Sequence, residues 1–267
     1  MIPTIAITAP VGAEGAPLLV LGPSLGTSTI LWEDAAPALV AHWRVAAWDL
    51  PGHGASPPAS RPFTVAELAD AVAHAIGELG GGPAFYAGVS LGGATGLELC
   101  LRHPELVRAA AIVASGAQLG DPAAWAERAA QVRSQSTGSL ITASAGRWFA
   151  PDSIARRPEL AGRLLHALRE ADDESYALCC EALAAYDVRD RLGEVAAPVL
   201  AVWGEFDAVA PEAKATEIAL GVSDGRIERI ADAAHLPPAE QPGAVGDLLA
   251  GFFSEIERRG HDAATTG

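Results

Sequence analysis

Short apolar runs rich in Val, Leu, Ile and Ala recur along this chain, separated by stretches with the spacing of amphipathic helices. Strands that are apolar along their whole length are buried on both faces, and strands that alternate with helices form a mostly parallel sheet. The pattern therefore predicts an α/β fold in which helices cover both faces of the sheet. Seven strands are expected, near residues 5–8, 18–21, 44–48, 84–88, 109–114, 199–203 and 226–230.

Helices are expected over residues 64–79, 92–103, 211–220 and 240–257. The first has the clearest start, because Thr64 and Glu67 have the spacing of a capping box. Between the strands that end near residue 114 and begin near residue 199, the pattern is helical throughout. This predicts a helical cap over residues 121–192, inserted into a core of residues 1–120 and 193–259. The polar last residues, 260–267, are expected to be disordered.

The net charge of −15 argues against a nucleic-acid partner, because affinity for a polyanion comes largely from Lys and Arg. No stretch has the roughly 20 apolar residues of a membrane-spanning helix, and the N-terminus lacks a signal-peptide pattern. We therefore expect a cytoplasmic protein without a membrane partner, and a homo-oligomer remains open. Cys100, Cys179 and Cys180 form no disulfide or metal-binding pattern, so they are expected to be packing residues, and neither a metal nor a cofactor is predicted.

The clearest chemical motif is GVSLG at residues 88–92, which follows an apolar strand and precedes a helix. This is the GxSxG nucleophile elbow in the strand-turn-helix context that it requires. The turn holds Ser90 in a strained backbone conformation that projects its hydroxyl, and the flanking glycines remove side chains that would collide with neighbouring backbone. The motif predicts that Ser90 is a catalytic nucleophile.

A serine hydroxyl is a weak nucleophile at neutral pH, so it needs a base within hydrogen-bond reach and an acid that orients the base. Asp207 follows the strand predicted near residues 199–203, and His235 follows the one near 226–230. Both residues therefore belong to loops at the carboxyl ends of strands, where such folds gather their sites. Ser90, Asp207 and His235 are accordingly predicted to form a catalytic triad.

Each member of this triad has neighbours that compete for its role. Glu205 lies two residues from Asp207 and remains an alternative acid, although the shorter side chain at the far end of the loop fits better. His53 also lies near a strand end, but a loop histidine is more often structural than catalytic. The other histidines fall on predicted helices, helix ends or the tail: His42, His74, His103, His166 and His261.

A tetrahedral intermediate needs two backbone N–H donors for its oxyanion. One is expected from Leu91, directly after the nucleophile, and the other from the loop that follows the strand near residues 18–21. Pro23 has no N–H to offer. Ser24 is therefore the first choice for the second donor, and Leu25 is the alternative.

On these residues the sequence resembles the 3-oxoadipate enol-lactonases of the α/β-hydrolase superfamily. The similarity covers nearly the whole chain; its more discriminating segments are SLGT at residues 24–27, RWF at 147–149 and YALCCEAL at 176–183. The resemblance implies an α/β-hydrolase fold and a serine hydrolase that opens 3-oxoadipate enol-lactone to 3-oxoadipate through an acyl-enzyme. This step belongs to protocatechuate and catechol catabolism, the β-ketoadipate pathway.

Such a substrate carries a carboxylate, so a strongly acidic protein needs a local cation to bind it. The predicted cap holds nine arginines and eleven acidic residues, which leaves it far less negative than the rest of the chain. Guanidinium groups bind carboxylates bidentately. Arg133 and Arg147 are the candidate carboxylate ligands, with Trp148 as an apolar wall of the pocket.

Other functions are compatible with the same triad. A carboxylesterase, a carbon-carbon bond hydrolase acting on ring-cleavage products and a cofactor-free perhydrolase share the triad, and only the cap would distinguish them. A non-catalytic binding protein on the same fold has no need of all three triad residues.

A fluorophosphonate should label the wild-type chain and fail to label the Ser90→Ala variant, because only an activated serine hydroxyl attacks the reagent. Gel fluorescence or intact-protein mass measures the labelling. A wild-type chain that neither reacts nor hydrolyses any ester would instead support the binding-protein reading.

Overall fold

The computed structural model describes the chain apart from residues 1, 81, 266 and 267, and it describes side chains as far as residue 260. The strands form one seven-stranded sheet in the order β1-β3-β2-β4-β5-β6-β7. Only β1 runs antiparallel to its neighbour, which confirms the mostly parallel sheet expected from the apolar runs. The strands are β1 Ala6–Ile7, β2 Leu18–Gly22, β3 Arg44–Asp49, β4 Ala84–Val89, β5 Val107–Val113, β6 Val199–Gly204 and β7 Gly225–Ile230.

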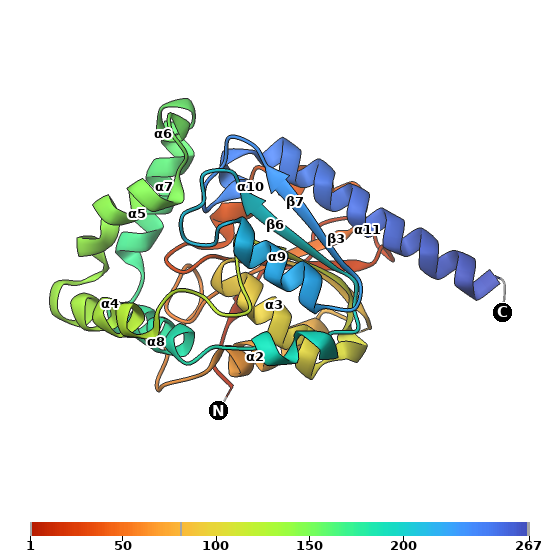
Figure 1. Ribbon diagram of the computed structural model, residues 1–267, viewed down its shortest axis with the longest axis horizontal. Helices are drawn as coiled ribbons and strands as arrows, with labels where there is room; N and C mark the ends of the chain where they lie inside the picture. Colours follow the sequence, from red (N-terminus) through yellow and green to blue (C-terminus); the bar gives the residue numbers. More distant parts are fainter. Residues whose placement is uncertain (1, 81, 266–267) are drawn as a thin grey trace.

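From β2 onward helices connect the successive strands, as Figure 1 shows. Those of the sheet layers are α1 Ala36–Val40, α2 Val65–Glu78, α3 Leu91–Arg102, α9 Glu212–Gly221, α10 Pro237–Glu240 and α11 Pro242–Thr265. Between β5 and β6 come α4 Pro122–Gln135, α5 Ile141–Trp148, α6 Ser153–Arg156, α7 Pro158–Glu170 and α8 Asp173–Ala184. Short 3-10 turns are η1 Thr29–Trp32, η2 Pro104–Leu106, η3 Thr137–Leu140 and η4 Arg189–Glu194. The predicted capping box starts α2: Thr64 and Glu67 each accept the other's backbone N–H.

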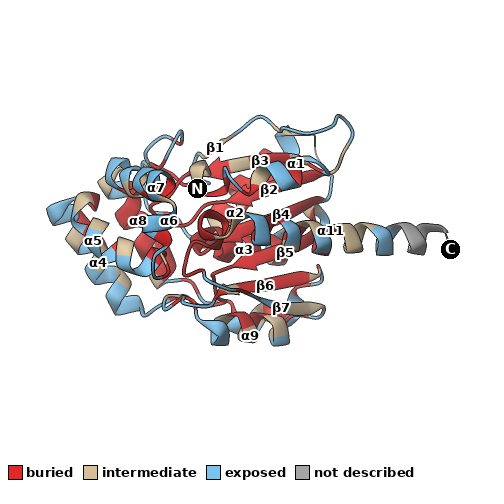
Figure 2. Ribbon diagram, turned by 90° about the horizontal axis from the view of Figure 1, so that it is seen from above, coloured by how far each residue is buried: buried red, intermediate tan, exposed pale blue. Residues whose placement is uncertain are grey.

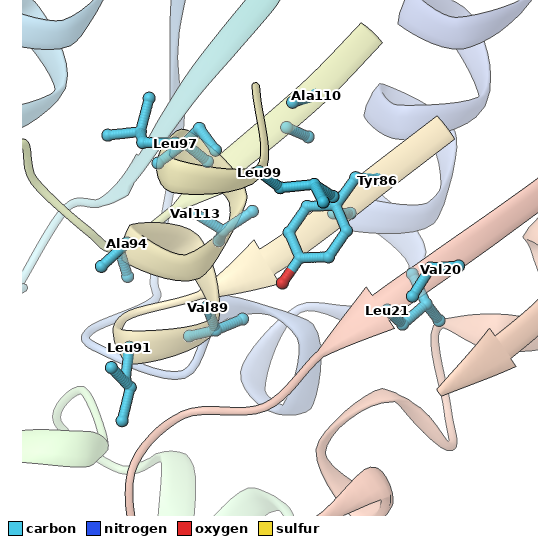
Figure 3. Packing of buried hydrophobic residues seen from close by; sticks show 14 of the residues in the cluster. Val20, Leu21, Tyr86, Val89, Leu91, Ala94, Leu97, Leu99, Ala110 and Val113 are labelled. Carbon is cyan, nitrogen blue, oxygen red and sulfur yellow. The ribbon is translucent and has the colours of Figure 1, made fainter. Parts of the chain in front are cut away.

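Two neighbouring residues of β4 show how helices cover both faces of the sheet. Successive side chains of a strand point to opposite faces. The ring of Phe85 lies 4.9 Å from that of Phe253 on α11, measured between ring centroids. Tyr86 packs against Gly96 of α3 and donates its hydroxyl to the carbonyl of Gly92 at 2.7 Å. Figure 3 shows the Tyr86 ring among the apolar side chains on this second face.

The helices α4 to α8 lie together beyond one end of the sheet in both Figure 1 and Figure 2. Figure 2 also shows that the central strands are buried, whereas much of α4 and α5 is exposed. Every regular element between β5 and β6 is a helix, in agreement with the helical pattern of this stretch. Their position brings side chains from α4 and α5 over the loops that carry the candidate site.

The end of the chain differs from the sequence prediction. A single helix was expected over residues 240–257, but the chain turns after α10 and α11 begins at Pro242, whose missing N–H is tolerated at a first helical position. The backbone of α11 remains helical through Thr265, so residues 260–265 of the predicted disordered tail are helical, and residues 266 and 267 lie outside the described chain. No helix among the described residues has the length and apolarity needed to cross a membrane.

The substitution of Leu by Ala can be compared at a buried position, Leu249, and at an exposed one, Leu220. Leu249 on α11 is 0% exposed and Leu220 on α9 is 82% exposed. Leu249→Ala should lower the free energy of unfolding by about 3 kcal/mol, because it removes buried methyl groups and leaves a cavity. Leu220→Ala should change it by less than about 0.5 kcal/mol. Urea denaturation measures both, and equal losses would contradict the packing of α11 described above.

Candidate active site

Ser90 occupies the turn between β4 and α3 with φ 55° and ψ −115°, a conformation that residues with a side chain rarely adopt. The turn is tight: a Cβ on Gly88 would lie 2.3 Å from the carbonyl oxygen of Gly92. Two hydrogen bonds hold the strained residue, one from its N–H to the carbonyl of Val113 at 2.9 Å and one from the Ser115 hydroxyl to its own carbonyl at 2.7 Å. The local sequence thus builds a nucleophile elbow.

His235 and Asp207 meet at the carboxyl ends of β7 and β6. The Nδ1 of His235 lies 3.0 Å from Oδ2 of Asp207, and both side chains are buried. The other carboxylate oxygen accepts the N–H groups of Val209 at 2.8 Å and Ala210 at 3.0 Å. Burial alone would raise the pKa of Asp207, but the charge and hydrogen bond of His235, with these N–H groups, hold it below its ordinary value. An ionised Asp207 places the ring proton on Nδ1 and leaves Nε2 as the basic nitrogen.

Glu205, the alternative acid, has different partners. Its carboxylate lies 2.9 Å from a guanidinium nitrogen of Arg229 and accepts the N–H of Asp232 at 3.1 Å. The side chain is partly exposed, whereas that of Asp207 is buried. The structure therefore brings Asp207, and not Glu205, to the histidine. No group of three His, Cys, Asp or Glu side chains in the described chain is arranged to hold a metal ion.

The oxyanion donors require a correction. The N–H of Ser24, the first choice, donates to the hydroxyl of Thr27 at 3.1 Å, and that hydroxyl donates to the Ser24 carbonyl at 2.8 Å. The prediction of Ser24 is therefore wrong, because its donor is already used within its own turn. Leu25 lines the same pocket as Ser90, and among the described hydrogen bonds its N–H has no acceptor. Leu91, the first residue of α3, has an N–H that the helix itself cannot satisfy.

A pocket of about 280 Å³ joins these groups to the helices between β5 and β6. The helices contribute Trp125, Arg128, Arg147 and Trp148 to its wall, and the loops contribute Ser90 and His235 among others. The remaining lining residues are Ser24, Leu25, Gly120, Asp121, Ala124, Ser144, Ala208 and Val209.

The two arginines of this wall lack an ionic partner. No carboxylate in the described chain lies within ion-pair distance of Arg128 or Arg147; Arg128 stacks over the ring of Trp125, and Nε of Arg147 donates to the Ala143 carbonyl at 3.2 Å. Partial burial, followed by the neighbouring charge of Arg128, lowers the pKa of Arg147. Sequence reasoning missed Arg128, although its three-residue spacing from Trp125 places both on one helix face.

Arg133 was predicted to face the substrate, and this prediction is wrong. Its guanidinium binds Glu174 at 2.7 and 2.8 Å and also pairs with Glu181, both on α8. It does not line the pocket. Arg133 therefore serves the packing of α4 on α8, while Arg147 and Trp148 lie in the pocket wall as expected.

Glu240 connects the histidine loop to the helices that cover it. Its buried carboxylate accepts the N–H of Ala150 at 2.6 Å, the hydroxyl of Ser153 at 2.8 Å and the N–H of Ala234 at 2.7 Å. Burial raises the pKa of Glu240, and these donors oppose the rise. The residue before His235 is thus tied to the segment after Trp148. This link could not be predicted from the sequence, because Ala150 and Ser153 lie 90 and 87 residues from Glu240 along the chain.

Comparisons with known proteins agree with this geometry. A 3-oxoadipate enol-lactonase of Acinetobacter baylyi is 33% identical over 233 residues, which is 87% of each chain. A pimeloyl-acyl-carrier-protein methyl ester esterase of Neisseria meningitidis is 33% identical over 238 residues, covering 86% of this chain and 75% of the esterase. The crystal structure of the enol-lactonase from Burkholderia xenovorans LB400 matches with a TM-score of 0.90 at 30% identity, over 94% of this chain and 96% of that one.

These matches confirm the resemblance to enol-lactonases that the motifs indicated, and they include an esterase of similar identity. The family model of the alpha/beta hydrolase fold matches residues 17–242. This span contains the elbow, both loops of the triad and all the helices between β5 and β6. The chain belongs to the α/β-hydrolase family.

Proposed function

We propose that this hydrolase opens a small anionic lactone, 3-oxoadipate enol-lactone, to 3-oxoadipate in the β-ketoadipate pathway of aromatic-acid catabolism. The observation that carries the proposal is the pair of arginines without acidic partners, Arg128 and Arg147, in the wall of the pocket that holds Ser90 and His235. The enol-lactonases among the similar proteins support the same substrate.

The two arginines would allow a strongly acidic protein to bind an anion. A chain of net charge −15 repels an anion at long range, so the pocket needs its own positive charge. Arg128 and Arg147 provide it in the same pocket that Ser90 and His235 line. Trp125 and Trp148 add apolar walls for the lactone ring. In the proposed complex the carboxylate binds the guanidinium groups and directs the ring carbonyl to Ser90.

Acylation follows from the triad. The Ser90 hydroxyl oxygen bonds to the lactone carbonyl carbon while Nε2 of His235 takes the hydroxyl proton, and the N–H groups of Leu25 and Leu91 bind the oxyanion. Collapse of the intermediate breaks the bond between the acyl carbon and the ring oxygen. The leaving group is an enolate tethered to the acyl chain; it takes the proton from Nε2 of His235, which restores the neutral histidine, and the resulting enol tautomerises to the ketone.

Deacylation uses the same groups. A water molecule loses a proton to Nε2 of His235 and its oxygen bonds to the acyl carbon, and the ester bond to Ser90 then breaks as the proton returns to the serine oxygen. Asp207 holds the ring orientation through both half-reactions. The product has two carboxylates, one of them formed at the elbow.

The reference assay compares the enol-lactone, p-nitrophenyl acetate and a ring-cleavage dienoate at equal enzyme concentration. We expect the highest kcat/KM for the enol-lactone, whose hydrolysis is measured as the loss of its ultraviolet absorbance. Preference for the neutral ester would favour a carboxylesterase, a reading supported by the esterase among the similar proteins. Preference for the dienoate would favour a carbon-carbon bond hydrolase.

Arg128→Gln and Arg147→Gln should each raise KM for the enol-lactone by about tenfold to a hundredfold, the equivalent of a charged hydrogen bond of about 1.5–3 kcal/mol. KM for p-nitrophenyl acetate should change little, because that ester has no carboxylate. Arg133→Gln is the matched control: its charge is neutralised by Glu174 and Glu181, so it should leave both KM values near those of the wild type. Equal effects on the lactone and the ester would refute the proposed ligands.

Asp207→Asn should lower kcat by about 10⁴-fold with the fold intact, because the amide no longer selects the productive tautomer of His235. Glu205→Gln, the matched control in the same loop, loses only an ion pair with exposed Arg229 and should leave kcat within a factor of about three. Steady-state kinetics on p-nitrophenyl acetate measures both variants. If Glu205→Gln lowered kcat more than Asp207→Asn did, Glu205 and not Asp207 would be the acid that orients His235.

A further inference from the structure

His53 is a buried histidine outside the triad whose two ring nitrogens both have backbone partners. Its Nδ1 lies 2.9 Å from the carbonyl oxygen of Pro51, and its Nε2 accepts the N–H of Gly26 at 3.2 Å. A carbonyl only accepts and an N–H only donates, so these contacts require a proton on Nδ1 and a lone pair on Nε2. Burial lowers the pKa of His53 to about 4, which keeps the ring in this neutral form at neutral pH.

Nε2 of His53 binds the turn of residues 24–27, which contains Leu25, the proposed oxyanion donor. The N–H of Thr27 donates to the carbonyl of Ser24 at 3.0 Å, and Gly26 between them has φ 81°. This is the pattern of a type II turn, which differs from type I in the orientation of its central peptide. Here the central peptide joins Leu25 to Gly26, and its N–H is the one that His53 binds.

We infer that His53 is a positioning residue that keeps the N–H of Leu25 directed at the oxyanion by holding the next peptide of its turn in one orientation. The inference rests on the proposed function, in which Leu25 is an oxyanion donor. If the central peptide rotated, the Leu25 carbonyl would face the Nε2 lone pair, and two acceptors repel. The Cα of Leu25 joins the central peptide to the preceding peptide, which carries the N–H of Leu25. Holding the central peptide in one orientation therefore also restricts the direction of that N–H.

Contacts from the covering helices hold the ring and the turn from the other side. The ring of His53 stacks on Tyr176 of α8, with 6.0 Å between centroids and 26° between planes. A Cβ on Gly26 would lie 3.3 Å from atoms of both Tyr176 and Trp148, so the turn packs directly against this part of α5 and α8. The pocket wall and the oxyanion turn are therefore packed as one unit, and His53 joins the turn to the loop after β3.

The test compares His53→Leu, which removes the acceptor at similar volume, with His53→Gln, whose side-chain oxygen can replace Nε2. His74→Leu is the matched control, because this histidine on α2 is exposed and its Nε2 lies 3.4 Å from a carboxylate oxygen of exposed Glu78. The readouts are kcat and KM for p-nitrophenyl acetate and the inhibition constant of a small alkyl trifluoromethyl ketone. The ketone forms a tetrahedral adduct with the serine and so reports oxyanion binding directly.

We expect His53→Leu to lower kcat by about tenfold to a hundredfold, less than the 10²- to 10³-fold effect of deleting a donor, with KM within about threefold. The inhibition constant of the ketone should rise by the same factor as kcat falls. His53→Gln should recover most of both losses, and His74→Leu should match the wild type. A structural role alone would lower the melting temperature without moving the ketone affinity relative to KM.

A folded His53→Leu variant with unchanged kcat and ketone affinity overturns the inference, as does a Gln variant no better than Leu. If neither variant folds, nuclear magnetic resonance of the wild type decides. A scalar coupling across the hydrogen bond between the Gly26 nitrogen and Nε2 of His53 should be present in the ketone adduct, and its absence overturns the inference. A wild-type chain inactive on every ester refutes the proposed function as well, whereas activity unaffected by His53→Leu refutes this inference alone.

Discussion

The close approach of two backbone turns, at Gly92 and Pro23, is the constraint on which the site depends. A Cβ on Gly92 would lie 2.5 Å from the Pro23 carbonyl oxygen, and the N–H of Gly92 donates to that oxygen at 3.0 Å. One turn carries the nucleophile and Leu91, and the other carries Leu25. The hydrogen bond fixes the distance between them before any substrate binds. Preorganised donors of this kind stabilise a developing charge without reorganising during the reaction.

The covering helices are fastened to the core at the same loops. Glu240 joins the histidine loop to the segment after α5, and the N–H of Leu236 donates to the Trp148 carbonyl at 3.3 Å. On the other side, the N–H of Asp172 donates to the carbonyl of Gly52 at 2.8 Å. A displacement of these helices would therefore move the pocket wall and the catalytic loops together. The pocket wall and the triad loops thus share one set of supports, although they belong to different parts of the chain.

The strands and the triad could be predicted because their signals are local. A strand buried on both faces is apolar along its length, and the carboxyl ends of parallel strands bring Ser90, Asp207 and His235 to one edge of the sheet. The pocket wall could not be predicted in the same way. Arg128 and Arg133 lie on one helix about 140° apart, and which of them faces acids on α8 depends on how two helices pack. The choice of donor in the loop after β2 likewise depended on the hydroxyl of Thr27, two residues beyond the candidates.

The charge pattern of the cap follows from the same packing. Arg133 is paired with two glutamates of α8, whereas Arg128 and Arg147 line the pocket and the charge of Arg128 contributes to the lowered pKa of Arg147. Partial burial and, after it, the neighbouring positive charge both disfavour the charged form of Arg147. In the proposed complex a carboxylate bound by both guanidinium groups would offset these two effects, because an opposite charge favours the charged form. A neutral ligand of the same shape would gain no such offset, so the proposed pocket would discriminate by charge even within a strongly acidic protein.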